Sequence, residues 1–231
     1  MLIPVSYFCK NYQMKIILTG ATGMVGNGAL INLLKREDIT GILSISRKPS
    51  GISNPKLKEV IHKDFYDLSS IANEMRGYDA VLFCLGISSV GLSKEEYFKI
   101  THTLTLHFAE TFKKENPSGK FCYISGAGTD SKEKGNGWAA VKGKTENDLI
   151  KLFEKNAYNF RPAFMKPVEG QSFVNKWYPY FSWMNTIFKP VFPYYFGSVA
   201  EVANAMANVA KTGYPSQVLE TKDIAVAAKN I

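Results

Sequence analysis

The stretch IILTGATGMVG, residues 16–26, joins an apolar run to three glycines spaced three residues apart. The run Ile16-Ile17-Leu18 indicates a buried strand, and the segment from Met24 to Arg36 has the composition of a helix. Free N–H groups at the start of such a helix, together with its dipole, favour an anion. A strand, a glycine turn and a helix in this order therefore predict a pyrophosphate-binding turn of a dinucleotide site.

Each of the three glycines has a role in this interpretation. Gly20 permits the tight turn, Gly23 lets the backbone approach a pyrophosphate, and Gly26 lets the helix pack against the strand. A glycine-rich turn in an unrelated α/β protein is the alternative. The residues expected to bind the cofactor here are Thr19, Gly20, Thr22, Gly23, Met24, Val25 and Gly26.

Short apolar runs alternate with longer amphipathic segments along the chain. Strands that are apolar almost throughout and separated by helices are typical of a parallel sheet covered on both faces. The sequence therefore predicts an α/β fold, a Rossmann-type doubly wound parallel sheet with a small C-terminal substrate or lid region. The expected strands are 15–18, 41–46, 57–61, 80–85, 121–125, 158–161 and 218–219, and the expected helices are 24–36, 69–76, 93–114, 137–155, 198–211 and 222–228.

Three parts are expected along the 231 residues. Residues 1–13 are an N-terminal extension without an assigned function, because MKIILTG already begins the first strand. Residues 14–161 form an NAD(P)-binding Rossmann domain, and residues 162–231 form a substrate-pocket or lid region packed on it. The aromatic, proline-interrupted stretch 171–196 is expected to wall the substrate pocket. A partner-binding or membrane-surface patch is the alternative for that stretch.

The end of the second predicted strand indicates which dinucleotide is bound. In NAD-binding folds an acidic side chain about 20 residues beyond the glycine turn accepts hydrogen bonds from the adenosine ribose. Here the strand ends in Ser46-Arg47-Lys48, without a carboxylate. Two cations suit a 2′-phosphate, which Arg47 can bind in a bidentate manner. We therefore expect NADP rather than NAD, with Arg47 and Lys48 as ligands; two solvated charges are the alternative.

These motifs resemble the short-chain dehydrogenase/reductase superfamily in its extended or atypical branch, whose usual turn is TGxxGxxG. The stretches HKDFYDL (62–68), VLFCLGIS (81–88) and YNFRPAFM (158–165) agree, although Ala163 replaces the family's glycine. The nearest group is that of the NAD(P)H-binding, Tat-interacting-protein-like atypical reductases. The resemblance implies that Asp64 meets the adenine and Gly86 lines the cofactor. Further cofactor contacts are expected from Phe65, Cys84, Leu85, Lys142 and Pro162.

The same resemblance implies a catalytic set, from which this sequence departs. The family uses a Tyr-x-x-x-Lys pair and a Ser or Thr after the fifth strand. The tyrosine protonates the carbonyl, and the lysine lowers the tyrosine pKa and holds the nicotinamide ribose. In GWAAVKGKTEND (137–148) Lys142 matches the lysine, but Trp138 occupies the tyrosine position. An indole N–H donates a hydrogen bond but does not exchange a proton usefully near neutral pH.

The catalytic hydroxyl is also displaced. In YISGAGTDS (123–131) Gly126 stands where the family has its Ser or Thr, so Ser125 is the nearest candidate and Thr129 a weaker one. Catalytic residues are therefore expected to be Lys142 and Ser125, with Trp138 in the tyrosine position. Replacement acids to consider are Tyr97, Tyr194 and Tyr195.

Two functions stay open at this point. The first is an atypical NADP-dependent reductase or epimerase-like isomerase with an altered proton donor. Its substrate would be a small carbonyl or sugar-like compound with an apolar or aromatic part. The second is a non-catalytic NADP(H)-binding redox sensor or regulatory scaffold. The departures at Trp138 and Gly126 favour the second, whereas the fold and cofactor turn favour the first.

The composition indicates which binding partners and which cellular location to expect. The net charge is +8, but the lysines are scattered, which does not favour nucleic acid. Three cysteines and three histidines form neither a disulfide framework nor a metal-ligand pattern, so no metal is expected. No window reaches the ~20 apolar residues of a membrane span, and the N-terminus lacks the features of a signal peptide. We therefore expect a cytoplasmic protein, a monomer or dimer, whose partners are a dinucleotide and a small-molecule substrate.

Overall fold

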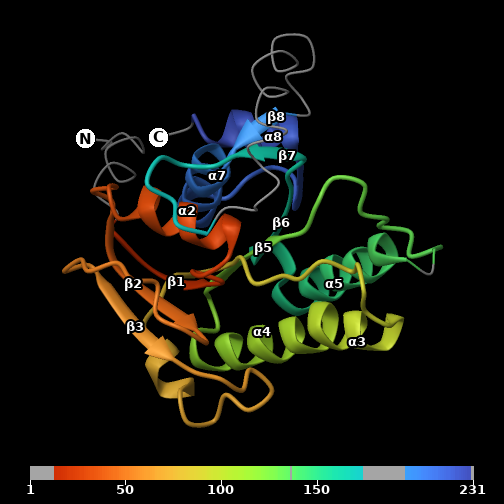
Figure 1. The fold of residues 1–231 in the computed structure, drawn as a ribbon, viewed down its shortest axis with the longest axis horizontal. Helices are drawn as coiled ribbons and strands as arrows, with labels where there is room; N and C mark the ends of the chain where they lie inside the picture. Colours follow the sequence, from red (N-terminus) through yellow and green to blue (C-terminus); the bar gives the residue numbers. More distant parts are fainter. Residues whose placement is uncertain (1–12, 136, 174–195, 230–231) are drawn as a thin grey trace, which may run out of the picture.

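A computed structural model describes residues 13–135, 137–173 and 196–229, and it contains a seven-stranded parallel sheet (Figure 1). The strand order is β3-β2-β1-β4-β5-β6-β9. This confirms the predicted Rossmann-type α/β fold. The strands are β1 (Met14–Thr19), β2 (Ile39–Ser46), β3 (Leu57–Ile61), β4 (Ala80–Phe83), β5 (Lys120–Ile124), β6 (Ala157–Arg161) and β9 (Val218–Glu220).

Helices cover both faces of the sheet (Figure 1). Ile16 and Leu18 point into one apolar core, and Ile17 between them points into the other. This alternation follows from the two-residue period of a strand and explains why the strands are apolar throughout. The first core is shared with α2 (Met24–Leu33), α7 (Val199–Thr212) and α8 (Thr221–Ala227), and the second with α4 (Leu104–Glu115) and α5 (Trp138–Phe153).

The strand order reverses between β1 and β4, because the chain runs outward from β1 to β2 and β3 and then returns to β4 on the other side. Doubly wound sheets bind ligands at the carboxyl ends of the strands beside this reversal. The buried hydroxyl oxygen of Thr19, at the end of β1, accepts a 3.2 Å hydrogen bond from the Leu85 N–H beyond β4. The two strand ends are thereby joined where a ligand is expected.

Two predicted helices differ from the structure. The segment 93–114 is divided into α3 (Lys94–Phe98), the π-helical turn η2 (Lys99–Thr103) and α4. The segment 69–76 forms only a short 3₁₀ turn, η1 (Ala72–Met75), which ends before Gly77 with its positive φ. A second 3₁₀ turn, η3 (Glu154–Asn156), follows α5.

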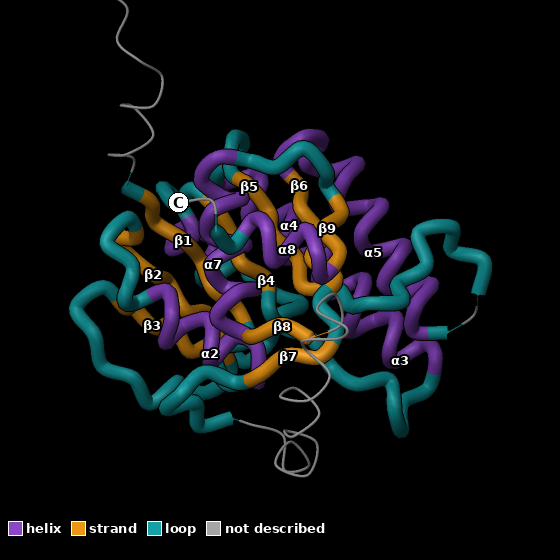
Figure 2. Tube along the Cα trace, turned by 90° about the horizontal axis from the view of Figure 1, so that it is seen from above, coloured by secondary structure: helices purple, strands orange, loops and turns teal. Residues whose placement is uncertain are grey.

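The C-terminal region adds a small second sheet that was not predicted. Strands β7 (Phe164–Lys166) and β8 (Phe196–Ser198) pair in parallel and lie side by side in Figure 2. The predicted N-cap of the following helix is confirmed, because the Ser198 hydroxyl accepts a 3.1 Å hydrogen bond from the Glu201 N–H. Most of the aromatic stretch 171–196, including Tyr194 and Tyr195, lies outside the described residues, as do residues 1–12.

Candidate cofactor and active site

The turn between β1 and α2 has close approaches that only glycine permits. Gly20 has a φ of +74°, and a Cβ atom there would lie 2.6 Å from the carbonyl oxygen of Cys84. A Cβ on Gly26 would lie 2.1 Å from the carbonyl oxygen of Gly20. Both separations are far below van der Waals contact. Glycine at position 20 therefore lets the turn pack on the end of β4, and glycine at position 26 lets α2 pack on the turn.

Gly23 is the N-cap of α2 and leaves the start of the helix open. Its N–H donates to the Gly20 carbonyl at 2.8 Å, and no side chain caps the helix. The first turn of α2 also carries no acidic residue. The positive end of the helix dipole therefore faces the exposed turn without a competing carboxylate, as an anion-binding site requires. Thr22, Met24 and Val25 are half-buried around it.

The segment after β7 is anchored to this turn. The Gln171 side-chain amide donates to the Met24 carbonyl at 2.7 Å, and the Ser172 N–H donates to the Asn27 side-chain oxygen at 3.1 Å. Asn27 in turn donates to the Ala21 carbonyl at 3.2 Å. The C-terminal region is thus bonded to the first turn of α2. Sequence reasoning missed these residues, because no local pattern links positions so far apart.

Arg47 and Lys48 are exposed at the carboxyl end of β2. The Ser46 hydroxyl donates to the Lys48 carbonyl at 2.6 Å, which closes a short turn. Among the described residues neither cation forms an ion pair within 4 Å. Their charges are therefore available to a ligand at this edge.

The candidate cofactor residues after β3 and β4 differ in burial: some are exposed and others are in the core. Asp64 is exposed, and its carboxylate accepts a 2.9 Å hydrogen bond from the Tyr66 N–H. Phe65 is 3% exposed and its ring stacks on Phe108, so this residue is part of the core. Beyond β4, Cys84 and Leu85 are half-buried and Gly86 is exposed.

Beyond β5 the hydroxyl groups are held within the loop. Ser125 Oγ lies 2.9 Å from Thr129 Oγ1, which donates to the Gly126 carbonyl at 2.8 Å. Both side chains are buried. A Cβ atom on Gly126 would meet nothing within 4 Å, so a serine would fit where the family has its hydroxyl. Buried Pro162 supports the same loop by accepting a 3.0 Å hydrogen bond from the Ala127 N–H.

Lys142 reaches the end of β5 from α5. Its Nζ donates to the Ser125 carbonyl at 3.1 Å and to the Ile124 carbonyl at 3.4 Å, and it lies 5.3 Å from the centre of the Tyr123 ring. Burial lowers the pKa of Lys142 to about 8, against the opposing charge of Glu146. This amine can therefore change protonation state close to neutral pH.

Trp138 lies one helical turn before Lys142 and is 42% exposed. Its ring borders the loop after β5: a Cβ atom added to Gly128 would lie 3.6 Å from it. Tyr97, a candidate replacement acid, is only 4% exposed, and burial raises its pKa. Tyr97 is therefore a poor source of a proton for a ligand in the cleft.

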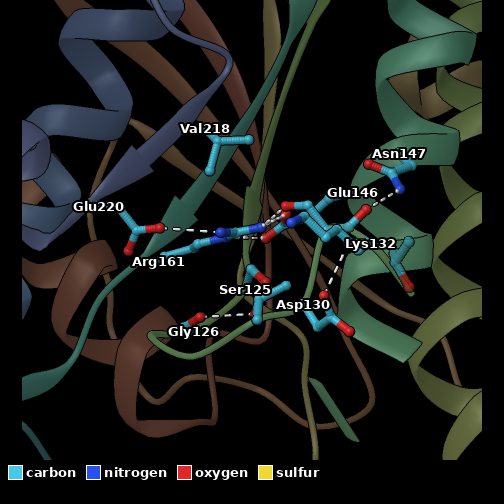
Figure 3. Close-up of polar contacts among 12 residues, drawn as sticks. Ser125, Gly126, Asp130, Lys132, Glu146, Asn147, Arg161, Val218 and Glu220 are labelled. Atoms are coloured by element: carbon cyan, nitrogen blue, oxygen red, sulfur yellow. Dashed lines mark hydrogen bonds and ion pairs between the residues drawn. The ribbon is translucent and has the colours of Figure 1, made fainter. Parts of the chain in front are cut away.

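A buried arginine joins α5 to the neighbouring loops (Figure 3). The Nε of Arg161 donates to Glu146 at 3.0 Å, and its Nη1 donates to Glu220 at 3.0 Å. A further guanidinium N–H contacts the Ser131 hydroxyl. Glu146 is fully buried, so this cluster fixes the helix that carries Trp138 and Lys142. Sequence reasoning missed the cluster, since its members come from four separate segments.

The chain belongs to the NAD dependent epimerase/dehydratase family, whose profile matches residues 16–141, more than half of its 231 residues. The predicted resemblance to extended short-chain dehydrogenases/reductases is thereby confirmed. The matched segment begins in β1, includes the glycine turn and ends at Val141, one residue before Lys142. Binding of a nicotinamide dinucleotide is the property that this family implies.

A curated relative is "Protein FMP52, mitochondrial" of Meyerozyma guilliermondii, 26% identical over 153 residues, which cover 66% of this chain. The match spans 65% of that protein's length. Its name corrects the expectation of a cytoplasmic location. That expectation rested on missing signal-peptide and membrane-span features, which do not separate the cytosol from an organelle.

Solved structures show the same fold at low identity. An oxidoreductase of Burkholderia thailandensis has a TM-score of 0.65, with 14% identity and 89% of each chain covered. ADP-L-glycero-D-manno-heptose-6-epimerase of Helicobacter pylori has a TM-score of 0.63, with 13% identity over 94% of this chain and 82% of that one. WbmH of Bordetella bronchiseptica, in complex with NAD+, has a TM-score of 0.63, with 18% identity over 87% and 72%.

In the ranges that the structure describes, no helix is long and apolar enough to cross a membrane. Within the same ranges, no group of three or more His, Cys, Asp or Glu side chains is placed to hold a metal ion. His102 instead pairs with Asp148 across η2 and α5, 2.9 Å from Nε2 to Oδ2.

Proposed function

We propose that the chain binds NADP(H) and uses it to reduce or isomerise a small carbonyl or sugar-like compound. The observation that carries this proposal is the glycine turn, open at the start of α2, together with the buried amine of Lys142 at the end of β5. The turn offers a pyrophosphate site, and Lys142 offers a cation beside the expected nicotinamide ribose. These residues fit a dinucleotide on their own geometry.

The preference for NADP over NAD rests on Arg47 and Lys48. Both side chains are exposed at the end of β2. In NAD-binding folds a carboxylate at this edge binds the ribose hydroxyls, whereas an arginine accommodates a 2′-phosphate. Charge-assisted hydrogen bonds to such a phosphate are worth about 1.5–3 kcal/mol each, and the lower end applies at an exposed site.

The proposed cofactor set extends along the sheet edge. Asp64 would lie near the adenine and Gly86 beside the ribose, with Cys84, Leu85 and Pro162 lining the cleft. The open space at Gly126 would face the reacting part of the substrate. The proposed substrate has an apolar or aromatic part.

A non-catalytic NADP(H)-binding sensor or scaffold is the second candidate. Trp138 and Gly126 favour it, because neither can supply the tyrosine or serine hydroxyl of the family's catalytic set. The two candidates share cofactor binding and differ only in turnover. Turnover therefore decides between them.

The test combines binding with turnover. NADPH and NADH binding is measured by calorimetry, and NADPH oxidation is followed with a panel of aldehydes, ketones and quinones. Steady oxidation by the natural sequence supports the reductase. Binding without turnover, with turnover gained in Trp138→Tyr plus Gly126→Ser, supports the sensor. Absence of NADPH and NADH binding refutes both.

A further inference from the structure

Resting on the proposed reductase function, we infer that the ammonium group of Lys142 is itself the proton donor in place of the missing tyrosine, with Glu146 and Arg161 as its positioning residues. The proton donor must lie at the carboxyl ends of β4 and β5. An acid is needed there that can lose a proton near neutral pH and that borders the expected nicotinamide site.

Five other polar residues that the structure describes near this edge do not meet that requirement. Tyr97 and Tyr123 are 4% and 1% exposed, and burial raises the pKa of both. Burial also raises the pKa of the Cys84 thiol. The hydroxyls of Ser125 and Thr129 are bonded to each other and do not ionise near neutrality.

Lys142 does meet the requirement. Its three N–H bonds exceed its two protein acceptors, the carbonyls of Ile124 and Ser125, so one N–H remains for a substrate oxygen. The two carbonyls hold Nζ beside the loop that carries Gly126, where the absent side chain leaves open space. Burial lowers the pKa of this amine to about 8, so the ammonium form dominates at neutral pH and can still lose a proton.

Glu146 and Arg161 set the charge around this amine. Glu146 lies one helical turn after Lys142, and its carboxylate opposes the loss of the ammonium charge. Two hydrogen bonds from Arg161 hold Glu146 and offset part of its charge. Tyr123 on β5 presents its ring face to Nζ. Arg161 thus balances the one carboxylate that acts on Lys142 among the described residues.

The proposed chemical step is the reduction of a carbonyl compound to an alcohol. When bound, NADPH would supply the hydride that the carbonyl carbon receives, and it would be left as NADP+. The N–H bond of Lys142 breaks as an O–H bond forms on the carbonyl oxygen, which yields the alcohol. Lys142 is left as a neutral amine, and water restores its proton.

The first test measures the amine directly, without cofactor or substrate. The protein is labelled with limiting acetic anhydride between pH 6 and 11, and acetylation of each lysine is quantified by mass spectrometry. Lys142 should label with a midpoint near 8. Lys144 is the internal control, because its ion pair with Asp148 raises its pKa above the usual 10.5. A Lys142 midpoint as high as that of Lys144 overturns the inference.

The second test uses Lys142→Arg, which keeps the positive charge but does not release a proton at neutral pH. NADPH affinity should stay within about threefold of the natural protein, whereas carbonyl reduction should fall by about 10²-fold or more, the typical contribution of a general acid. Lys144→Arg should leave both unchanged. Glu146→Gln should shift the alkaline limb of the kcat profile to lower pH by about one unit, because the opposing charge is removed.

The outcomes separate this inference from the proposed function. Turnover that survives in Lys142→Arg overturns the donor and leaves the reductase standing. Absence of turnover in the natural protein with every carbonyl compound overturns the reductase and the donor together. If Glu146→Gln does not fold, the labelling midpoint and Lys142→Arg still decide the question.

Discussion

Gly20→Ala tests how the cofactor turn is built. Gly20 has a φ of +74°, and an added Cβ would lie 2.6 Å from the Cys84 carbonyl oxygen. The left-handed conformation costs a non-glycine residue about 1–2 kcal/mol. The forced overlap with β4 adds about 1–3 kcal/mol, as for other overpacked sites. The expected loss of unfolding free energy is therefore about 2–5 kcal/mol.

Gly77→Ala is the matched control. Gly77 has a φ of +80°, but a Cβ there would meet nothing within 4 Å. It precedes β4 at the opposite end of that strand from the cofactor turn. Its substitution should therefore cost only the conformational term of about 1–2 kcal/mol. Any effect of alanine on the unfolded chain is shared by both variants and cancels in their difference.

Urea denaturation followed by tryptophan fluorescence gives both free energies. Gly20→Ala should be the less stable variant by about 1–3 kcal/mol. NADPH affinity should fall more than about tenfold in Gly20→Ala and stay within about twofold in Gly77→Ala, since only the first displaces the pyrophosphate turn. Equal stabilities of the two variants would refute the argument from close approach.

Three further perturbations test other parts of the site. Arg47→Ala should weaken NADPH binding about tenfold, the loss of one charge-assisted hydrogen bond at an exposed site, and should leave NADH binding within about twofold; calorimetry with both cofactors, and with Lys222→Ala as a control, checks this. Gln171→Ala should lower the unfolding free energy by about 1 kcal/mol and weaken NADPH binding, because the bond to the Met24 carbonyl is lost; unchanged urea midpoint and affinity would contradict the anchoring role. Asp148→Asn tests the pH dependence of stability. Burial raises the pKa of Asp148, but hydrogen bonds from His102, Lys144 and Lys151 outweigh it, so the pKa is lowered. The ionised carboxylate therefore stabilises the fold above the unfolded pKa of about 3.9, and this contribution is lost as the pH falls below that value. The free energy of unfolding should therefore fall more steeply from pH 7 to pH 2 in the natural protein than in Asp148→Asn. The same pH dependence in both proteins would contradict a stabilising role of the Asp148 carboxylate.

The fold class could be predicted because the strands are buried on both faces. Ile16, Ile17 and Leu18 are all fully buried, which only a sheet between two helical layers allows. The glycine spacing likewise reflects contacts that the structure shows at Gly20 and Gly26. The contact of Gly26 with Gly20 lies within the turn itself, so local sequence carried that information. The contact of Gly20 with Cys84 beyond β4 is not local, and Gly20 was predicted only from its part in the tight turn.

Features that depend on distant segments could not be predicted. Strands β7 and β8 have three residues each and pair across a separation of more than thirty residues. Each strand is too short to show the alternation of apolar and polar residues that indicates a strand. The π-helical turn Lys99–Thr103 lies inside a segment whose apolar spacing indicates one continuous helix.

The same reason applies to the site. Sequence similarity put the family's hydroxyl at Gly126 and left Ser125 as the nearest candidate, but only the structure shows that Ser125 is buried against Thr129. Phe65 fits the family motif in sequence, yet its ring belongs to the core. The cluster of Arg161, Glu146 and Glu220 depends on the packing of β6 against α5 and β9, which no single segment encodes.

The central claim is that this chain is an NADP(H)-binding member of its family. The most direct test is the dissociation constant of NADPH and of NADH for the purified natural protein, measured by calorimetry at one salt concentration. Both cofactors should bind, with NADPH at least about tenfold tighter, or about 1.4 kcal/mol. Equal affinities would contradict the role of Arg47 and Lys48, and absence of binding would contradict the claim as a whole.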